Sequence, residues 1–137
     1  LTGDLFVYPS ALTGGAADTE YAFLDLETSG LHPKRGARVL EVGIVRTDAH
    51  GAVLAEWSTL VNPGRGKDVG PAHIHRITDR MVADAPRFAD IVNDLLCHLE
   101  GAVVVAHNAT FENTFLALLT DPWVMTGPGG RACGRRG

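Results

Sequence analysis

The sequence has few cysteines, no long apolar run and no excess of positive charge, and each absence excludes a class of protein. Cys97 and Cys133 form no C-x-x-C spacing, so they predict neither a zinc site nor a disulfide framework, and we expect two free thiols. No apolar stretch is long enough to span a bilayer, and the first residues lack the pattern of a secretory signal. We therefore expect a cytoplasmic protein with no membrane association.

The charge balance limits how the chain could act on nucleic acid. Its formal net charge is −4, whereas domains that coat nucleic acid by bulk electrostatics are usually basic. A nuclease is compatible with this charge, because it can hold a strand end through metal ions and a few local cations. The chain has 137 residues, of which 45% are hydrophobic and 20% charged, and this composition predicts one globular domain.

Turn-forming residues divide the chain into three parts. Residues 1–19 carry proline and glycine around short apolar patches without a sustained period, which predicts a leader or linker. Residues 20–119 hold the periodic apolar segments of the expected domain. Residues 120–137 are rich in glycine and arginine and poor in apolar groups, which predicts a disordered tail.

Apolar periodicity predicts the order of elements within the domain. Three strands, the first ending at two carboxylates and the others at 38–47 and 53–61, are expected to form an antiparallel meander. A short helix capped by Thr78 precedes a longer one that starts at Pro86 and has an apolar stripe. The apolar run 102–106 is typical of a central strand covered on both faces, and a helix at 110–119 follows it. This α/β order matches the ribonuclease H-like fold.

The stretch YAFLDLETSG, from Tyr21 to Gly30, ends its buried strand with two carboxylates. Asp25 and Glu27 are two residues apart, so their side chains share one face of the strand. Neighbouring carboxylates repel each other unless a cation lies between them, and Mg²⁺ and Mn²⁺ prefer oxygen ligands. Small residues after Glu27 would let the backbone approach a ligand closely. The pair predicts a metal site; a strand that simply ends in solvent is the alternative.

The segment VVVAHNATFENTFL supplies a third carboxylate after the second buried strand. Glu112 falls in the first turn of the expected helix, which Asn108 could cap. A carboxylate at this place points over the strand ends where Asp25 and Glu27 emerge. The alternative is a glutamate that only stabilises the helix through its dipole.

These two segments resemble the first and second motifs of the DnaQ-like DEDD (DEDDh-type) 3′-5′ exonucleases, a superfamily that includes bacterial proofreading exonuclease subunits and ribonuclease T. In the second motif this chain has Glu112 where the family has aspartate, which puts metal affinity or rate in doubt because Mg²⁺ geometry is strict. A third segment, IHRITDRMVADAP, is similar to the IHGIT-type segment of the family, with Arg76 where glycine is common. Together the segments cover about Tyr21 to Leu119.

The resemblance implies a metal-dependent 3′-5′ exonuclease with two divalent ions, Mg²⁺ or Mn²⁺. It assigns Asp25 to both ions, Glu27 to the ion that activates water, and Glu112 to the ion near the leaving group. It implies a single-stranded nucleic-acid 3′ end as substrate and a DNA polymerase subunit as partner. The nucleotide contacts carried over from the family are Leu26, Thr28, Gly30, His75 and Phe111, although a lone histidine is more often an ordinary loop residue.

Loop cations and a missing motif leave the function of this chain open. Seven cations could form a phosphate track, or could be ordinary solvated charges: Lys34, Arg35, Arg38, Arg65, Lys67, Arg76 and Arg80. The family's third motif supplies a histidine base and a fourth carboxylate, and no histidine follows Leu119. We therefore expect a C-terminally truncated domain with weak or absent cleavage. The two hypotheses are an exonuclease and a non-catalytic remnant that binds nucleotides or a partner.

Overall fold

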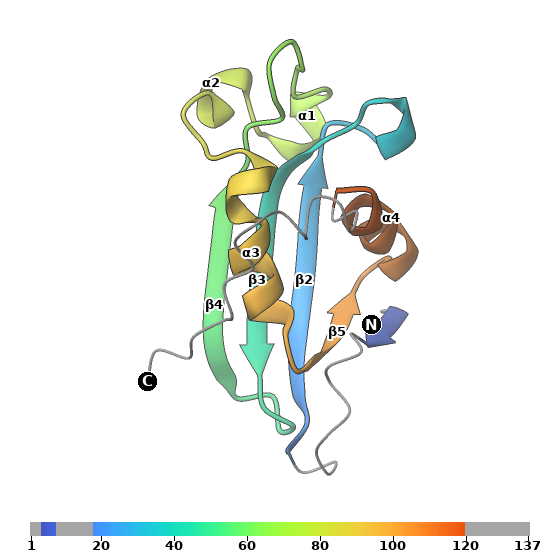
Figure 1. Ribbon diagram of the computed structural model, residues 1–137, viewed down its shortest axis with the longest axis vertical. Helices are drawn as coiled ribbons and strands as arrows, with labels where there is room; N and C mark the ends of the chain where they lie inside the picture. Colours follow the sequence, from blue (N-terminus) through green and yellow to red (C-terminus); the bar gives the residue numbers. More distant parts are fainter. Residues whose placement is uncertain (1–3, 8–17, 120–137) are drawn as a thin grey trace, which may run out of the picture.

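A five-stranded sheet organises the computed structural model, which describes residues 4–7 and 18–119 (Figure 1). The strands lie in the order β1-β5-β2-β3-β4. Their bounds are β1 (Asp4–Val7), β2 (Glu20–Thr28), β3 (Val39–Thr47), β4 (Val53–Leu60) and β5 (Ala102–Ala106).

Strands β2, β3 and β4 form the expected antiparallel meander. Strand β5 pairs with β2 in parallel, with Leu24 opposite Ala106. The two strands therefore run in the same direction, and β5 ends beside Leu24, one residue before Asp25. The ribonuclease H-like fold is confirmed for the described residues.

Four α-helices and one 3-10 turn connect and cover the strands. Their bounds are η3 (Pro33–Arg35), α1 (Ala72–His75), α2 (Asp79–Val82), α3 (Phe88–Leu99) and α4 (Ala109–Leu119). The hydroxyl of Thr78 accepts the backbone N–H of Met81 at 3.3 Å, so the expected N-cap of α2 is confirmed. Helix α1 was not expected, because a single turn of four residues leaves no periodic signal.

Helix α3 starts two residues later than its apolar pattern predicts. The carbonyl of Pro86 accepts the backbone N–H of Asn62 at 2.8 Å, which ties this residue to the preceding loop. Arg87 then takes an extended conformation as N-cap, and its N–H is accepted by the Asp90 carboxylate at 3.0 Å. The backbone N–H of Asp90 in turn donates to the Arg87 carbonyl at 2.9 Å, and the two bonds together fix the start of the helix at Phe88.

The main hydrophobic core lies between one face of the sheet and helices α3 and α4 (Figure 1). Because side chains alternate along a strand, every second residue of β2 faces this core. Helix α3 contributes the apolar stripe that its spacing predicts, and α4 contributes two large buried side chains. The members that carry this packing are Ala22, Leu24, Leu26, Ile91, Leu95, Leu99, Phe115 and Leu116.

The opposite face of the sheet is open within the described residues. A hollow of about 880 Å³ lies over it, lined among others by Phe23, Asp25, Val45 and Val105. Alternate residues of β5 are only half-buried on this side. The expectation that β5 is covered on both faces is therefore not met by the part of the chain that the structure describes.

The first residues of the chain also differ from expectation. Asp4 to Val7 form β1, which pairs antiparallel with β5 from Asp4 opposite Ala106 to Val7 opposite Val103. The sequence does not predict this strand, because its four residues have no sustained period. The predicted tail at 120–137 lies outside the described residues, and the division into three parts stays a prediction.

The structure also bears on the cysteines and on possible membrane-spanning helices. Cys97 on α3 is disulfide-bonded, so the expectation of free thiols is wrong at this position. Within residues 4–7 and 18–119, no helix has both the length and the apolarity needed to cross a bilayer.

Candidate active site

Strand β2 carries its two carboxylates on the open face of the sheet. Leu26 between them is only 6% exposed and packs in the core, as the alternation predicts. Asp25 is exposed and Glu27 is half-buried, because the loops beyond β2 begin to cover the strand at this point. Both side chains therefore lie at the carboxyl end of a central strand, on the side away from α3.

Glu27 is surrounded by more negative charge than its sequence neighbours alone would provide. Partial burial raises the pKa of Glu27, and the charges of Asp25 and Glu41 raise it further, while His75 acts in the opposite direction. Glu41 lies directly opposite Glu27 in the β2–β3 pairing. Sequence reasoning missed Glu41, although the meander register, once known, places it there.

Glu112 reaches the same edge of the sheet from the first turn of α4. Asn108 caps this helix: its side-chain oxygen accepts the N–H of Phe111 at 3.2 Å, and its carbonyl accepts the N–H of Glu112 at 3.2 Å. The expected role of Asn108 is thus confirmed. Because β5 is parallel and adjacent to β2 and ends opposite Leu24, the helix that follows it begins near the part of β2 that carries Asp25.

The carboxylate of Glu112 is 4% exposed, and its Oε2 has no hydrogen-bond partner. Burial raises the pKa of Glu112, and the negative charge of Asp25 raises it further. Hydrogen bonds from the backbone N–H groups of Glu112 and Asn108 lower it. A buried charged oxygen without a partner costs at least about 1–3 kcal/mol, so it calls for an explanation such as an ion. Glu112 and Asp25 are close enough to repel each other, as the site hypothesis requires.

The donor set fits a divalent cation by its chemistry. It consists of hard carboxylate oxygens, it carries an excess of negative charge, and it includes an oxygen that no group in the described residues satisfies. In the described ranges, however, no three His, Cys, Asp or Glu side chains converge into a group that could hold a metal ion. The three expected ligands share a sheet edge, and their joint coordination of ions stays a prediction.

A glycine contact holds the loop after β4 against the end of β2. Gly70 has a φ of +70°, and a Cβ added to it would lie 2.1 Å from the carbonyl oxygen of Ser29. Ser29 is itself fixed to β3, since its N–H donates to the Arg38 carbonyl at 2.8 Å and its hydroxyl accepts the Arg38 N–H at 2.9 Å. Only glycine allows this approach, which holds Gly70 and its loop against the turn that follows Glu27.

His75 is placed near Glu27 by this loop, but its ring nitrogens are already in use. Nδ1 accepts the backbone N–H of Ile77 at 3.0 Å, so the proton is on Nε2, which donates to the carbonyl of Val69 at 2.7 Å. The ring therefore braces the loop. A contact of His75 with a nucleotide stays a prediction and would have to use the face or edge of the ring.

The other expected nucleotide contacts differ in how accessible they are. The Thr28 hydroxyl donates to the Gly30 carbonyl at 2.8 Å and closes the turn after β2. Phe111 is half-buried, with its ring 4.8 Å from that of Phe115 at an interplanar angle of 55°. Leu26 lies in the core, so it could offer a ligand only its backbone.

Comparison with known proteins finds sequence relatives and a matching family model. A family model described as exonuclease, RNase_T, matches residues 22–118. The DNA polymerase III subunit epsilon of Treponema pallidum is 40% identical over 96 residues, covering 70% of this chain and 44% of that protein. A DNA polymerase III subunit epsilon-like protein of Rhodobacter capsulatus is 40% identical over 97 residues, covering 70% of this chain and 14% of that protein. The chain spans less than half the length of these relatives.

Solved structures of exonuclease I have the same fold. A product-bound exonuclease I superposes with a TM-score of 0.66 at 19% identity, covering 84% of this chain and 29% of that one. E. coli exonuclease I in complex with a dT13 oligonucleotide gives a TM-score of 0.65 at 19% identity, covering 84% and 27%. At this identity the likeness concerns the fold, whereas the family model covers well over half of the sequence. The chain belongs to the RNase_T family of exonucleases.

Proposed function

We propose that this domain is a metal-dependent 3′-5′ exonuclease, which hydrolyses phosphodiester bonds at nucleic-acid 3′ ends and releases nucleoside monophosphates. The observation that carries the proposal is the unpartnered, buried Oε2 of Glu112 at the sheet edge that also holds Asp25. A purely structural glutamate at the start of a helix would be expected to face water or a hydrogen-bond donor.

In this proposal, Asp25, Glu27 and Glu112 hold two Mg²⁺ or Mn²⁺ ions. When bound, such ions neutralise charge on the scissile phosphate and lower the pKa of a water molecule. The protein provides ligands on two rigid elements, β2 and α4, whose relative position is set by the parallel β2–β5 pairing. Glu41 is a further carboxylate beside Glu27, and we assign it a positioning role there.

The turn after β2 and the start of α4 would receive the terminal nucleotide. Thr28 and Gly30 form a short hydrogen-bonded turn directly after Glu27, so their backbone can approach a ligand without obstruction. Phe111 precedes Glu112 by one residue in the first turn of α4. An aromatic ring at this place could pack against a base.

The relatives suggest the partners and the setting of this activity. Two of them are named as DNA polymerase III epsilon or epsilon-like proteins, and one solved relative holds a single-stranded oligonucleotide. We therefore propose a single-stranded 3′ end as substrate, a DNA polymerase subunit as partner and the cytoplasm as location. These remain proposals, because the chain spans only part of each relative.

A degradation and binding assay tests the proposal. The purified chain is incubated with end-labelled single-stranded DNA and RNA in Mn²⁺ or EDTA, and nucleoside monophosphate binding is measured in parallel. We expect Mn²⁺-assisted binding that Asp25→Ala abolishes, with slow cleavage at most, because a general base typically contributes about 10²- to 10⁴-fold. Grafting a family C-terminal segment with its third motif after Leu119 should restore degradation from the 3′ end.

The control variant is Asp84→Ala, which removes an exposed carboxylate on the loop after α2. It should leave binding and cleavage unchanged. Rapid degradation that survives Asp25→Ala would show that the site is wrong. Nucleotide binding that is indifferent to Mn²⁺, with no cleavage even after grafting, would favour the non-catalytic binding remnant.

A further inference from the structure

We propose that a second hollow, beside the carboxylate site, binds backbone phosphates of the substrate strand, and that Arg35 and Lys67 are its cations. This inference rests on the proposed function, and it adds a binding site for the strand behind the terminal nucleotide. The hollow measures about 340 Å³ and opens between the η3 turn and the loop that follows β4. The residues that define it are Ser29, Gly30, Arg35, Gly36, Lys67 and Asp68.

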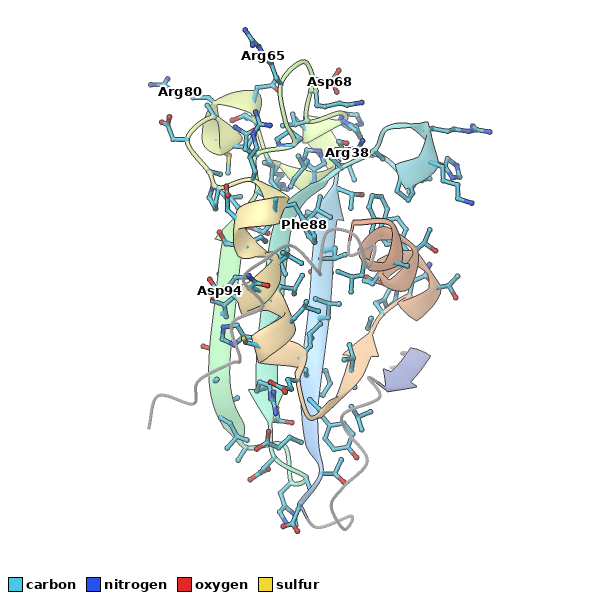
Figure 2. The ribbon with its side chains drawn as sticks, viewed as in Figure 1. Arg38, Arg65, Asp68, Arg80, Phe88 and Asp94 are labelled. Carbon is cyan, nitrogen blue, oxygen red and sulfur yellow. The ribbon has the colours of Figure 1, made fainter. Side chains whose placement is uncertain are left out.

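Three of the seven loop cations are held elsewhere or point away from this hollow. The Arg38 guanidinium donates to the carbonyls of Ala37 at 2.9 Å and Pro33 at 3.4 Å, so it holds the η3 turn. Figure 2 shows the side chains of Arg65 and Arg80 extending outward from the loops at the top of the molecule. Arg35 and Lys67 both line the hollow.

The two cations come from separate loops and meet across Gly36. This residue has a φ of +99°, and a Cβ added to it would lie 3.0 Å from the Nζ of Lys67. The Lys67 ammonium therefore lies directly over the residue that follows Arg35. The backbone N–H of Lys67 donates to Gly64 at 3.1 Å, which closes the turn that points the side chain across the gap.

Within residues 4–7 and 18–119, no ion pair neutralises the charges of Arg35 and Lys67. In the described part of the chain, the one ion pair joins Arg46 to Glu20, on other elements. Asp68 also lines the hollow, but its carboxylate accepts the backbone N–H of Gly70 at 2.9 Å and is held by its own loop. Two cations against one committed carboxylate leave the hollow net positive, although the whole chain is acidic.

The position of the hollow suits a strand whose 3′ end lies at the carboxylates. Its floor, Ser29 and Gly30, continues β2 directly beyond Glu27, and three residues of chain reach at most about 10 Å. Successive phosphates of a strand follow one another at roughly 3.4 Å or more along its axis. A strand that places its end at Asp25 would thus bring one of the next few phosphates over Arg35 and Lys67.

The test compares two double variants that remove the same charge. Arg35→Gln/Lys67→Gln changes the hollow, and Arg65→Gln/Arg80→Gln changes two outward cations. Binding in Mn²⁺ is measured for a single-stranded 10-mer with phosphorothioate linkages, for a nucleoside 5′-monophosphate and for inorganic phosphate, over a series of salt concentrations. The single variants Arg35→Gln and Lys67→Gln, with melting curves, guard against loss of folding.

The double variant Arg35→Gln/Lys67→Gln should bind the 10-mer at least about fivefold more weakly than the wild type, because two charge-assisted contacts are lost. Its salt dependence should become shallower by about 0.7 per lost phosphate contact in a plot of log K against log salt. Monophosphate binding should not change, and the control variant should change 10-mer binding by less than about twofold. Inorganic phosphate should bind more weakly than the 10-mer, since it makes only one set of contacts.

Equal weakening by both double variants would overturn the site in favour of general surface charge. A wild-type chain that binds the 10-mer no better than the monophosphate would overturn it as well. Failure of the proposed function is recognised separately, by monophosphate binding that ignores Mn²⁺ and Asp25→Ala. If binding of the 10-mer still depends on Arg35 and Lys67 in that case, the proposed phosphate-binding site is retained.

Discussion

At the scale of single residues, Glu112 links stability to function. Its carboxylate is held almost out of water by the start of α4, and one oxygen has no partner. The fold therefore carries an electrostatic cost at this residue in the absence of a cation. The same cost would be relieved by ligand binding, so the site and the stability of the domain should respond together.

We expect Glu112→Gln to stabilise the metal-free chain by on the order of 1 kcal/mol at neutral pH, because the buried charge is removed. Burial raises the pKa of Glu112, so the folded chain keeps this proton to higher pH than the unfolded chain does. Stability of the wild type should consequently fall as pH rises through that raised pKa, and the variant should lose this slope.

Denaturant unfolding in EDTA at several pH values measures this effect. Mn²⁺ at about 100 times its Kd should add ~2.7 kcal/mol to the wild type and clearly less to the variant. Glu100→Gln, at an exposed position after α3, is the matched control and should change neither quantity. A variant that is less stable than the wild type in EDTA would contradict the assignment of a costly buried charge.

Gly70 makes a second prediction at this scale. Gly70→Ala should cost more than about 1–3 kcal/mol, because the side chain meets both a positive φ and the carbonyl of Ser29 at 2.1 Å. Gly51→Ala is the matched control: its φ is +85° and no atom lies within 4 Å of the added Cβ, so only the backbone strain applies. Thermal or urea unfolding of both variants separates the two contributions, and equal losses would show that the Ser29 contact is relieved easily.

Loss of this contact should also affect ligand binding. The loop that Gly70 holds carries Lys67 and leads to His75. A folded Gly70→Ala chain should therefore bind a single-stranded 10-mer more weakly than Gly51→Ala does. Unchanged binding would separate the loop from the site.

At the scale of elements, the C-terminal end of α3 is fastened to two strands. The His98 ring stacks on Trp57 of β4, with centroids 5.0 Å apart and planes at 20°. Arg46 of β3 donates to the carbonyls of His98 at 3.0 Å and Glu100 at 2.7 Å, and it forms an ion pair with Glu20. A cation at these last carbonyls satisfies acceptors that the helix leaves open.

This attachment should make α3 sensitive to acid. Burial lowers the pKa of His98 below 6.5, and Arg46 acts in the same direction against the opposing charge of Asp94. The folded chain then binds fewer protons than the unfolded chain in this range, so stability is full above about pH 6.5 and is lost as pH falls through the folded pKa.

Unfolding curves at pH 7.5 and pH 5 should show this loss in the wild type and a smaller one in His98→Gln. A proton NMR titration should place the His98 pKa below its ordinary value and lower still in Asp94→Asn, because that carboxylate favours the charged ring. A pKa that rises in Asp94→Asn would refute the assigned cause.

Strand β1 gives a prediction with an internal control. Leu5 and Phe6 pair with Val105 and Val104 of β5, and the backbone groups of successive residues point to opposite sides of a strand. Proline has no backbone N–H. One of the two variants Leu5→Pro and Phe6→Pro should therefore lose a hydrogen bond to β5, and the other should lose only an N–H that points away from β5. We expect the two variants to differ by at least about 1 kcal/mol in unfolding free energy. Equal, small effects would mean that β1 adds little to stability.

The elements also show how far sequence patterns reach. The sequence predicts the meander, α3 and α4 from their apolar periods, and it predicts β5 from a continuous apolar run between glycine and histidine. Strand β1 was missed because four residues carry no period, and its pairing with β5 joins residues about a hundred positions apart. Glu41 was missed for a related reason, since its importance depends on strand register and not on a motif.

At the scale of the whole molecule, the features linked to function gather at one end. The carboxyl end of β2, the η3 turn and the loops that hold α1 and α2 lie toward the top of Figure 1, and β5 ends lower, where α4 begins. The motifs predicted this common edge, because a helix that follows a strand parallel to β2 must begin there. They could not predict that the carboxylates stop short of a three-ligand group, since side-chain distances depend on packing and on the ions themselves.

The position of β4 in the sheet has a consequence for the behaviour of the protein in concentrated solution. Within the described residues β4 has a neighbour on one side only, and Val53 and Leu54 are 59% and 53% exposed. An edge strand of eight residues without proline or lysine leaves a row of open backbone donors and acceptors that a second molecule can pair with. Sedimentation should therefore show self-association that grows with protein concentration and that Leu54→Lys suppresses, so the sheet edge sets the solubility of the domain.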